Sequence, residues 1–128
     1  MCRICWRAIN CLSRQISKAA DGAILTGTLG AGLEVVDGQA AARLCALNIL
    51  AQAKAALGDL GRIKQVLRLT GFVSSAPGFF DQPLVVNGAS DLIGDVLGDA
   101  GKHTRAAVGV ASLPANAAVE IDAILQVA

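Results

Sequence analysis

Tyrosine is absent from this 128-residue chain, and aromatic residues as a whole make up only 3% of it. Hydrophobic residues nevertheless reach 54%, so the core must be built from Ala, Val, Leu and Ile. Such side chains bury less apolar area than aromatic ones, which makes association of several copies a natural supplement to the stability of one domain. The length itself indicates a single domain.

Features that mark nucleic-acid and membrane proteins are missing as well. The net charge is +1, and there is no basic stripe, aromatic platform or RNA-binding motif, so we expect no nucleic-acid partner. No apolar run reaches the ~18 residues of a membrane span, and the N-terminus lacks the apolar region of a signal peptide. We therefore expect a cytoplasmic protein with no membrane partner, in which the four cysteines are reduced thiols.

The sequence also lacks the residue spacing that is typical of metal-binding and nucleotide-binding sites. Cys2, Cys5 and Cys11 lie close together, but zinc sites usually need four ligands in paired spacing, and the single histidine, His103, is far away in sequence. The glycines between residues 27 and 32 are not followed by the Lys-Ser/Thr of a phosphate-binding loop, so we interpret them as a flexible connection. We expect no metal and no cofactor.

The first fourteen residues differ from the rest of the chain. They hold three of the four cysteines and the only Met and Trp. We treat residues 1–14 as an atypical N-terminal segment and residues 15–128 as a single domain. Our hypothesis is that the segment reflects an altered reading frame or a misplaced start, which an intact upstream frame encoding an ordinary strand would confirm.

The middle of the chain alternates between helical and strand patterns. Apolar residues recur at helical spacing from Gln39 to Leu57, with Asp37 as the expected N-cap and Gly58 just past the end. Alternation from Ile63 to Ser74 predicts a half-buried strand. A second helix is expected from near Asp81 to about Leu97.

Two extended segments, 104–111 and 119–127, complete the chain around a short connection that contains Pro114. This pattern predicts a hairpin. The order of elements is then strand, helix, strand, helix, strand, strand, which indicates an α+β protein with two helices on one face of a mixed or antiparallel sheet.

Successive side chains of a strand point to opposite faces of the sheet, so the sequence predicts which residues of these two strands share a face. Arg105, Ala107 and Gly109 share one face of the first strand, whose small residues leave room beside the guanidinium. Glu120 lies on the polar face of the second strand. In a hairpin, Arg105 and Glu120 would be offset by about four residues, or ~13 Å, so a compact site would need either the reach of the two side chains or completion by another subunit.

The C-terminal motif Arg-x-x-Val-x-Val-x-x-Leu-Pro, followed by Val-Glu-Ile-Asp-Ala-Ile, resembles the C-terminal signature of the RidA/YjgF family of enamine/imine deaminases, also labelled endoribonuclease L-PSP. The matching positions are Arg105, Val108, Val110, Leu113, Pro114, Val119, Glu120, Ile121, Ala123 and Ile124. The likeness extends upstream to about Gln15, and Asp122 replaces a second Glu. It implies a chorismate-mutase-like fold and a homotrimer with active sites between subunits.

The resemblance also implies roles for individual residues. Arg105 matches the arginine that holds the carboxylate of a 2-aminoacrylate-type enamine or its imine tautomer. Glu120 matches the residue that orients the attacking water, and Asn87 aligns with a helix asparagine near the pocket. Ser13 matches the first residue of the family's Ser-Gly-Gln-Ile-Pro segment.

Three departures from the family pattern bear on activity. Arg14 replaces the glycine that follows Ser13 in the family, and the family's N-terminal tyrosine has no counterpart here. Ala107 replaces the Cys or Thr that many active members carry. These departures favour loss of catalysis over loss of ligand binding.

Each residue also has a simpler structural interpretation. Arg105 could be a strand-end arginine that extends to water, Glu120 a solvent-facing carboxylate, and Asn87 an ordinary exposed polar residue. His103 could be a structural histidine at a loop edge, and Cys45 fits a small core position in the helix.

Two functions follow, from different classes. The first is hydrolytic deamination of reactive enamine/imine intermediates of amino-acid metabolism, releasing a 2-keto acid and ammonia. The alternative is a non-catalytic trimeric protein that binds a small carboxylate-bearing metabolite in the same inter-subunit cleft. A third possibility, endoribonuclease activity, rests only on the family's label, because the sequence has no cluster of basic residues that would bind RNA.

Overall fold

The computed structural model describes residues 3–7 and 10–128. Seven strands, two α-helices and three short 3₁₀ helices follow one another along this part of the chain. In order they are β1 (Arg3–Arg7), β2 (Asn10–Ile16), β3 (Thr28–Leu29), β4 (Gly32–Leu33), α1 (Val35–Leu57), η1 (Leu60–Arg62), β5 (Ile63–Ser74), α2 (Gln82–Leu97), η2 (Gly98–Gly101), β6 (Thr104–Val110), η3 (Pro114–Asn116) and β7 (Val119–Val127).

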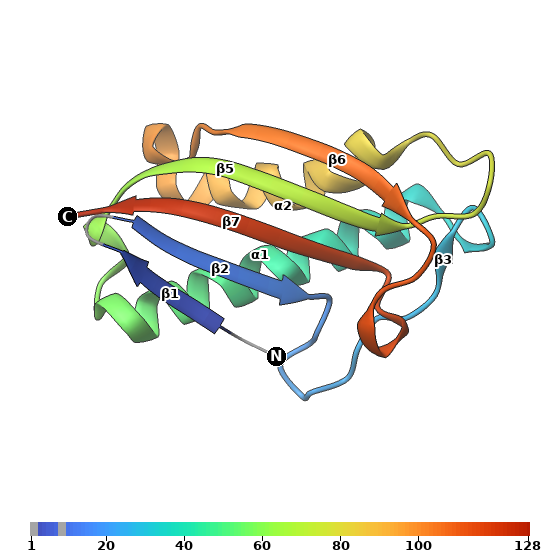
Figure 1. Ribbon diagram of the computed structural model, residues 1–128, viewed down its shortest axis with the longest axis horizontal. Helices are drawn as coiled ribbons and strands as arrows, with labels where there is room; N and C mark the ends of the chain where they lie inside the picture. The colour runs from blue at the N-terminus through green and yellow to red at the C-terminus, as the bar shows by residue number, and fades with distance from the viewer. Residues whose placement is uncertain (1–2, 8–9) are drawn as a thin grey trace.

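Five of the strands form one sheet in the order β1-β2-β7-β5-β6, while β3 and β4 form a separate small pair. The β5–β6 pair is parallel and the other pairs of the large sheet are antiparallel. Both α-helices lie on the same face of the sheet, α1 behind β2 and β7 and α2 behind β5 and β6 (Figure 1). The expected α+β class, with a mixed sheet and two helices on one face, is confirmed.

The predicted hairpin between the last two strands is wrong. Strand β5 lies between β6 and β7, and it pairs with both. The connection between them crosses the end of β5 through η3, where Ala115 and Asn116 adopt left-handed φ values of 57° and 56°. Strand alternation is the same whether two neighbouring strands pair directly or flank a third, so the pattern could not distinguish these arrangements.

The limits of most central elements agree with the sequence. Strand β5 and helix α2 lie within a residue of their expected positions, and α1 ends before Gly58, which has a φ of 83°. The start of α1 differs from the expectation. Glu34 is the N-cap, and Asp37 lies inside the first turn, where its carboxylate accepts a hydrogen bond of 2.8 Å from the Glu34 backbone N–H. Asp37 therefore stabilises the cap from within the helix.

The N-terminal part contains a strand that the sequence did not indicate. Strand β1 pairs with β2, and β2 pairs with β7 over its full length. The separation of residues 1–14 from the domain stays a prediction. The expected absence of a metal at Cys2, Cys5 and Cys11 concerns side chains outside those that the structure describes.

The core lies between the sheet and the two helices. Its α1 side is rich in small residues, since Ala41, Ala42, Cys45 and Ala46 are all fully buried. No described helix is both long enough and apolar enough to cross a lipid bilayer.

A glycine allows the two helices to cross at close range. A Cβ atom placed on Gly88 of α2 would lie only 2.2 Å from the backbone oxygen of Gln39 in α1. No side-chain adjustment can relieve a clash with backbone. Gly88 therefore fixes how closely α2 approaches α1, and with it the position of α2 over β5 and β6.

We expect Gly88→Ala to lower the free energy of unfolding by about 1–3 kcal/mol, because the added methyl group must push the two helices apart. Gly94→Ala is the matched control: it lies in the same helix with open space around its Cβ position, and should raise stability by about 1 kcal/mol. Urea denaturation measures both. Equal stability of Gly88→Ala and wild type would contradict the close crossing.

Candidate functional site

Arg105 lies between the edge strand β6 and helix α2. In the β5–β6 pairing, Arg105 lies directly opposite Leu69 of β5. Cross-strand partners point to the same face, and Leu69 is fully buried in the core, so Arg105 lies on the face that the helices cover. Its Nη1 donates to Ser90 Oγ and its Nη2 donates to the carbonyl oxygen of Pro83, each at 3.2 Å. Both partners belong to α2, and the side chain is partly buried. The guanidinium is therefore held against the helix at both terminal nitrogens.

No carboxylate neutralises this guanidinium among the side chains that the structure describes, which are those of residues 13–128. The ion pairs found there are Arg14–Asp122 at 3.4 Å and Lys102–Asp99 at 3.2 Å. Both partners of Arg105 are uncharged, and they use two of its five N–H donors. The positive charge and three N–H groups remain for an anion.

The residues that face one another across β6 and α2 form what we call the β6–α2 seam. They are Arg105, Ala107 and Gly109 from β6, and Gln82, Pro83, Asn87 and Ser90 from α2. The β6 members are level with Leu69, Gly71 and Val73 of β5, which places all three on one face, as the alternation predicted. Beyond Arg105, Ala107 packs against the core, and Gln82 and Ser75 take up the room beside Gly109.

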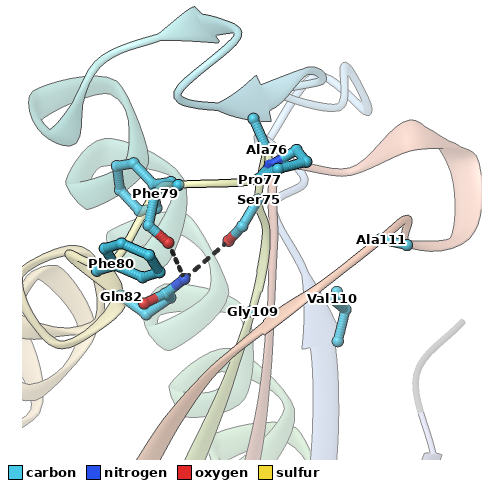
Figure 2. Close-up of a pocket in the computed structure, with 10 residues that line it drawn as sticks. Ser75, Ala76, Pro77, Phe79, Phe80, Gln82, Gly109, Val110 and Ala111 are labelled. Carbon is cyan, nitrogen blue, oxygen red and sulfur yellow. Dashed lines mark hydrogen bonds between the residues drawn. The ribbon is translucent and has the colours of Figure 1, made fainter.

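An open cavity of about 570 Å³ adjoins the seam at the end of β6. Figure 2 shows Gln82 on one wall of the cavity, beside Phe79 and Phe80, where Nε2 donates to the Phe79 carbonyl oxygen at 2.8 Å and to Ser75 Oγ at 3.3 Å. A Cβ on Gly109 would lie 2.8 Å from that nitrogen, so the glycine makes room for the amide. The sequence indicated only a loop in this region, and the cavity was not predicted.

The structure brings Asn87 to the same seam as Arg105 and Ala107. Asn87 lies one helical turn after Pro83 and one turn before Ser90, so all three occupy one face of α2. It is partly buried. The Asn87 side chain thus lies on the same face of α2 as Pro83 and Ser90, whose oxygen atoms accept hydrogen bonds from Arg105.

Glu120 does not share this seam within one subunit. It is level with Phe72 of β5, whereas Arg105 is level with Leu69. Three residues along a strand amount to about 10 Å, and an odd spacing places the two side chains on opposite faces of the sheet. Glu120 therefore lies on the helix-free face.

Ser13 is also distant from Arg105. It belongs to β2, separated from β6 by β7 and β5, and strand spacing alone gives a distance of about 14 Å. The side chain is buried, and its Oγ accepts a 3.4 Å hydrogen bond from Gln15 Nε2. The substrate-binding role assigned to Ser13 from the family resemblance stays a prediction, and it would require another subunit.

His103 contacts a residue that the sequence analysis did not identify. Its Nε2 lies 2.9 Å from Ser90 Oγ, and its Nδ1 lies 2.6 Å from the Gly101 carbonyl oxygen. Ser90 is thus shared between His103 and Arg105. A lone helical serine carries no sequence signal, and His103 lies just before β6 begins at Thr104.

Cys45 is a core residue and not a candidate nucleophile. Its Sγ lies 3.4 Å from the Val119 carbonyl oxygen, and the side chain is fully buried. Burial raises the pKa of the Cys45 thiol far above its usual value, and the negative charge of Glu120 adds to this shift. Among the described residues, no group of three His, Cys, Asp or Glu side chains is arranged to hold a metal ion.

Comparison with known proteins identifies the family. The profile of the family described as "YjgF/chorismate mutase-like, putative endoribonuclease" matches residues 10–125. The chain therefore belongs to the YjgF/chorismate mutase-like family. Protein TCP17 of Trypanosoma cruzi is 54% identical over 116 residues, which cover 90% of this chain and 72% of TCP17.

Solved structures agree with this assignment. Atu1372 of Agrobacterium tumefaciens, a protein of unknown function, is 51% identical with a TM-score of 0.95, over 98% of this chain and 81% of its own. TdcF of E. coli, solved with bound serine, is 22% identical with a TM-score of 0.64, over 98% and 86% of the two chains. The second comparison shows the shared fold.

We expect Cys45 to resist alkylation in the folded protein between pH 7 and 9. Only the thiolate reacts, and the raised pKa keeps the thiol protonated below that pKa. The measurement is iodoacetamide labelling by mass spectrometry in a variant with Cys2, Cys5 and Cys11 changed to Ser. Labelling should require denaturant. Rapid labelling of the native protein would show that the thiol is accessible and ionised.

Proposed function

We propose that this protein recognises a small carboxylate-bearing metabolite at the β6–α2 seam and acts there as a RidA-like deaminase. Its substrates would be reactive enamine/imine intermediates of amino-acid metabolism, and its products a 2-keto acid and ammonia. The observation that carries the proposal is the partly buried guanidinium of Arg105, which has no acidic partner among the described residues. Cytoplasmic location is part of the same proposal.

Recognition follows from the chemistry of the guanidinium. Its planar fork matches a carboxylate with two parallel hydrogen bonds. The neutral partners on α2 hold the side chain without competing for its charge, and the amide of Asn87 lies on the same helix face. Serine, the ligand in the TdcF structure, is itself a small carboxylate, so this fold accommodates such ligands.

The reaction requires little besides positioning and a base. Arg105 would hold the carboxylate while water adds to the imine carbon, and Glu120 would accept a proton from that water. Glu120 passes that proton to the imine nitrogen, which completes a carbinolamine. Glu120 then takes the hydroxyl proton and passes it to the same nitrogen, so that the C–N bond breaks, ammonia leaves, and the C–O bond becomes the carbonyl of the 2-keto acid. No redox change occurs.

Glu120 must come from another copy, because it lies on the opposite face of the sheet from Arg105 within one subunit. We propose a homotrimer in which a neighbouring copy packs along the sheet edge at β6 and over the helix-free face, so that its Glu120 approaches the seam from beyond that edge. The same face carries Val108, whose side chain is 43% exposed, together with Phe72 and Ile124. Burying such apolar residues favours association.

A second candidate function keeps the ligand and omits the reaction. Ala107 offers no polar group in the middle of the seam, and no carboxylate approaches Arg105 within the described part of one subunit. A protein of this kind would bind a 2-keto acid or amino acid in the same cleft without turnover.

Arg105 variants test recognition. We expect Arg105→Ala to abolish calorimetric binding of pyruvate or 2-ketobutyrate, since each hydrogen bond to a charged group contributes roughly 1.5–3 kcal/mol. Arg105→Lys keeps the charge but loses the fork, so it should weaken binding at least tenfold. Arg43→Ala, at an exposed position of α1, is the control and should bind as wild type does. Wild-type affinity in Arg105→Ala would refute carboxylate recognition at this site.

Ammonia release from freshly generated 2-iminobutyrate separates the two candidate functions. A deaminase should release ammonia in the wild type, whereas Glu120→Gln should bind pyruvate normally but turn over at least a hundredfold more slowly, because the base is gone. Binding without ammonia release above the uncatalysed rate would assign the non-catalytic function.

Light scattering at micromolar concentration tests the oligomer. We expect a mass three times the 13.0 kDa of the chain. A monomer mass would remove the inter-subunit site, and with it the catalytic role of Glu120.

A further inference from the structure

A chain of hydrogen bonds links Arg105 to the backbone through two side chains that no catalytic step uses. It runs from Arg105 Nη1 to Ser90 Oγ at 3.2 Å, from Ser90 Oγ to His103 Nε2 at 2.9 Å, and from His103 Nδ1 to the Gly101 carbonyl oxygen at 2.6 Å. Ser90 comes from α2, Gly101 from the end of η2, His103 from the connection that follows, and Arg105 from the start of β6. All three side chains are partly buried.

The partners at the two ends fix the direction of every hydrogen bond. The Gly101 carbonyl can only accept, so His103 Nδ1 carries a proton and donates it. In neutral imidazole, Nε2 is then an acceptor and the Ser90 hydroxyl donates to it. Guanidinium can only donate, so Ser90 Oγ accepts from Arg105. With the Nδ1–H tautomer, each donor has an acceptor.

We propose that Ser90 and His103 are positioning residues that set the orientation of the Arg105 guanidinium for two-point recognition of a carboxylate. The inference rests on the proposed carboxylate recognition, which it deepens by naming what aligns the fork. His103 directs the Ser90 hydroxyl proton toward itself, and this turns the oxygen lone pairs of Ser90 toward Arg105.

Two anchors make this alignment effective. Ser90 restrains Nη1 and the Pro83 carbonyl restrains Nη2, so the plane of the guanidinium is fixed at both ends before a ligand arrives. An unrestrained arginine loses side-chain conformational entropy when a ligand immobilises it. Restraint in the free protein lowers that cost on binding and raises affinity without any new ligand contact.

The imidazole signals of the free protein test the hydrogen-bond chain without any ligand. His103 is the only histidine, so its two nitrogen resonances need no assignment by mutagenesis. We expect a long-range ¹⁵N–¹H spectrum at pH 8.5 to show the proton on Nδ1. A proton on Nε2 would reverse the direction of the chain and overturn the inference.

Pyruvate binding by calorimetry tests the consequence. We expect Ser90→Ala to weaken binding about tenfold and His103→Phe, which keeps the ring but removes both nitrogens, to weaken it about threefold. Ser90→Thr retains the hydroxyl and should recover most of the affinity. Thr104→Ala is the control, because it removes a neighbouring β6 hydrogen bond, from Thr104 Oγ1 to the Leu67 carbonyl oxygen at 3.0 Å, without touching Arg105.

The outcomes separate this inference from the proposed function. If wild type binds pyruvate and Ser90→Ala binds it equally well, the positioning role is wrong while carboxylate recognition stands. If Ser90→Ala and Thr104→Ala lose the same affinity, the effect reflects strand stability and the positioning role is also wrong. Failure of wild type to bind any 2-keto acid would instead refute the proposed function.

Discussion

The position of β5 between β6 and β7 determines where Arg105 and Glu120 lie. Residues directly across from one another in a sheet share a face, so the register of β5 with its two neighbours sends Arg105 toward α2 and Glu120 toward the helix-free side. The close crossing of α1 and α2 at Gly88 then holds the seam face of α2 against β6. This pairing arrangement thus places the positively charged Arg105 on one face of the sheet and the Glu120 carboxylate on the other.

Local pattern predicted the parts of the fold that local physics determines. The expected limits of β5 and α2 agree with the structure, and the small-residue face of β6 followed from the two-residue period. The strand order could not be predicted from the residues in this way. Whether β6 and β7 pair directly or around β5 depends on contacts between distant segments, and both arrangements bury the same alternating side chains.

The positions of the candidate site residues were predictable to a similar extent, and their roles stay predictions. Arg105 and Asn87 came from the family resemblance, and the structure places both at the seam. Ser90 could not be predicted, because a single serine on a helix has no characteristic spacing, and its importance arises only when folding brings His103 and Arg105 to it. The cavity beside Gln82 likewise depends on a loop, β6 and α2 meeting in space.

The central claim is that the Arg105 charge is left without an acidic partner so that a ligand carboxylate can supply one. A crystal structure of the assembled protein with pyruvate tests it most directly. We expect both carboxylate oxygens at about 2.7–2.9 Å from guanidinium nitrogens, with the hydrogen bond to Ser90 retained. An Asp or Glu of a neighbouring copy paired with Arg105, and pyruvate absent from the seam, would contradict the account.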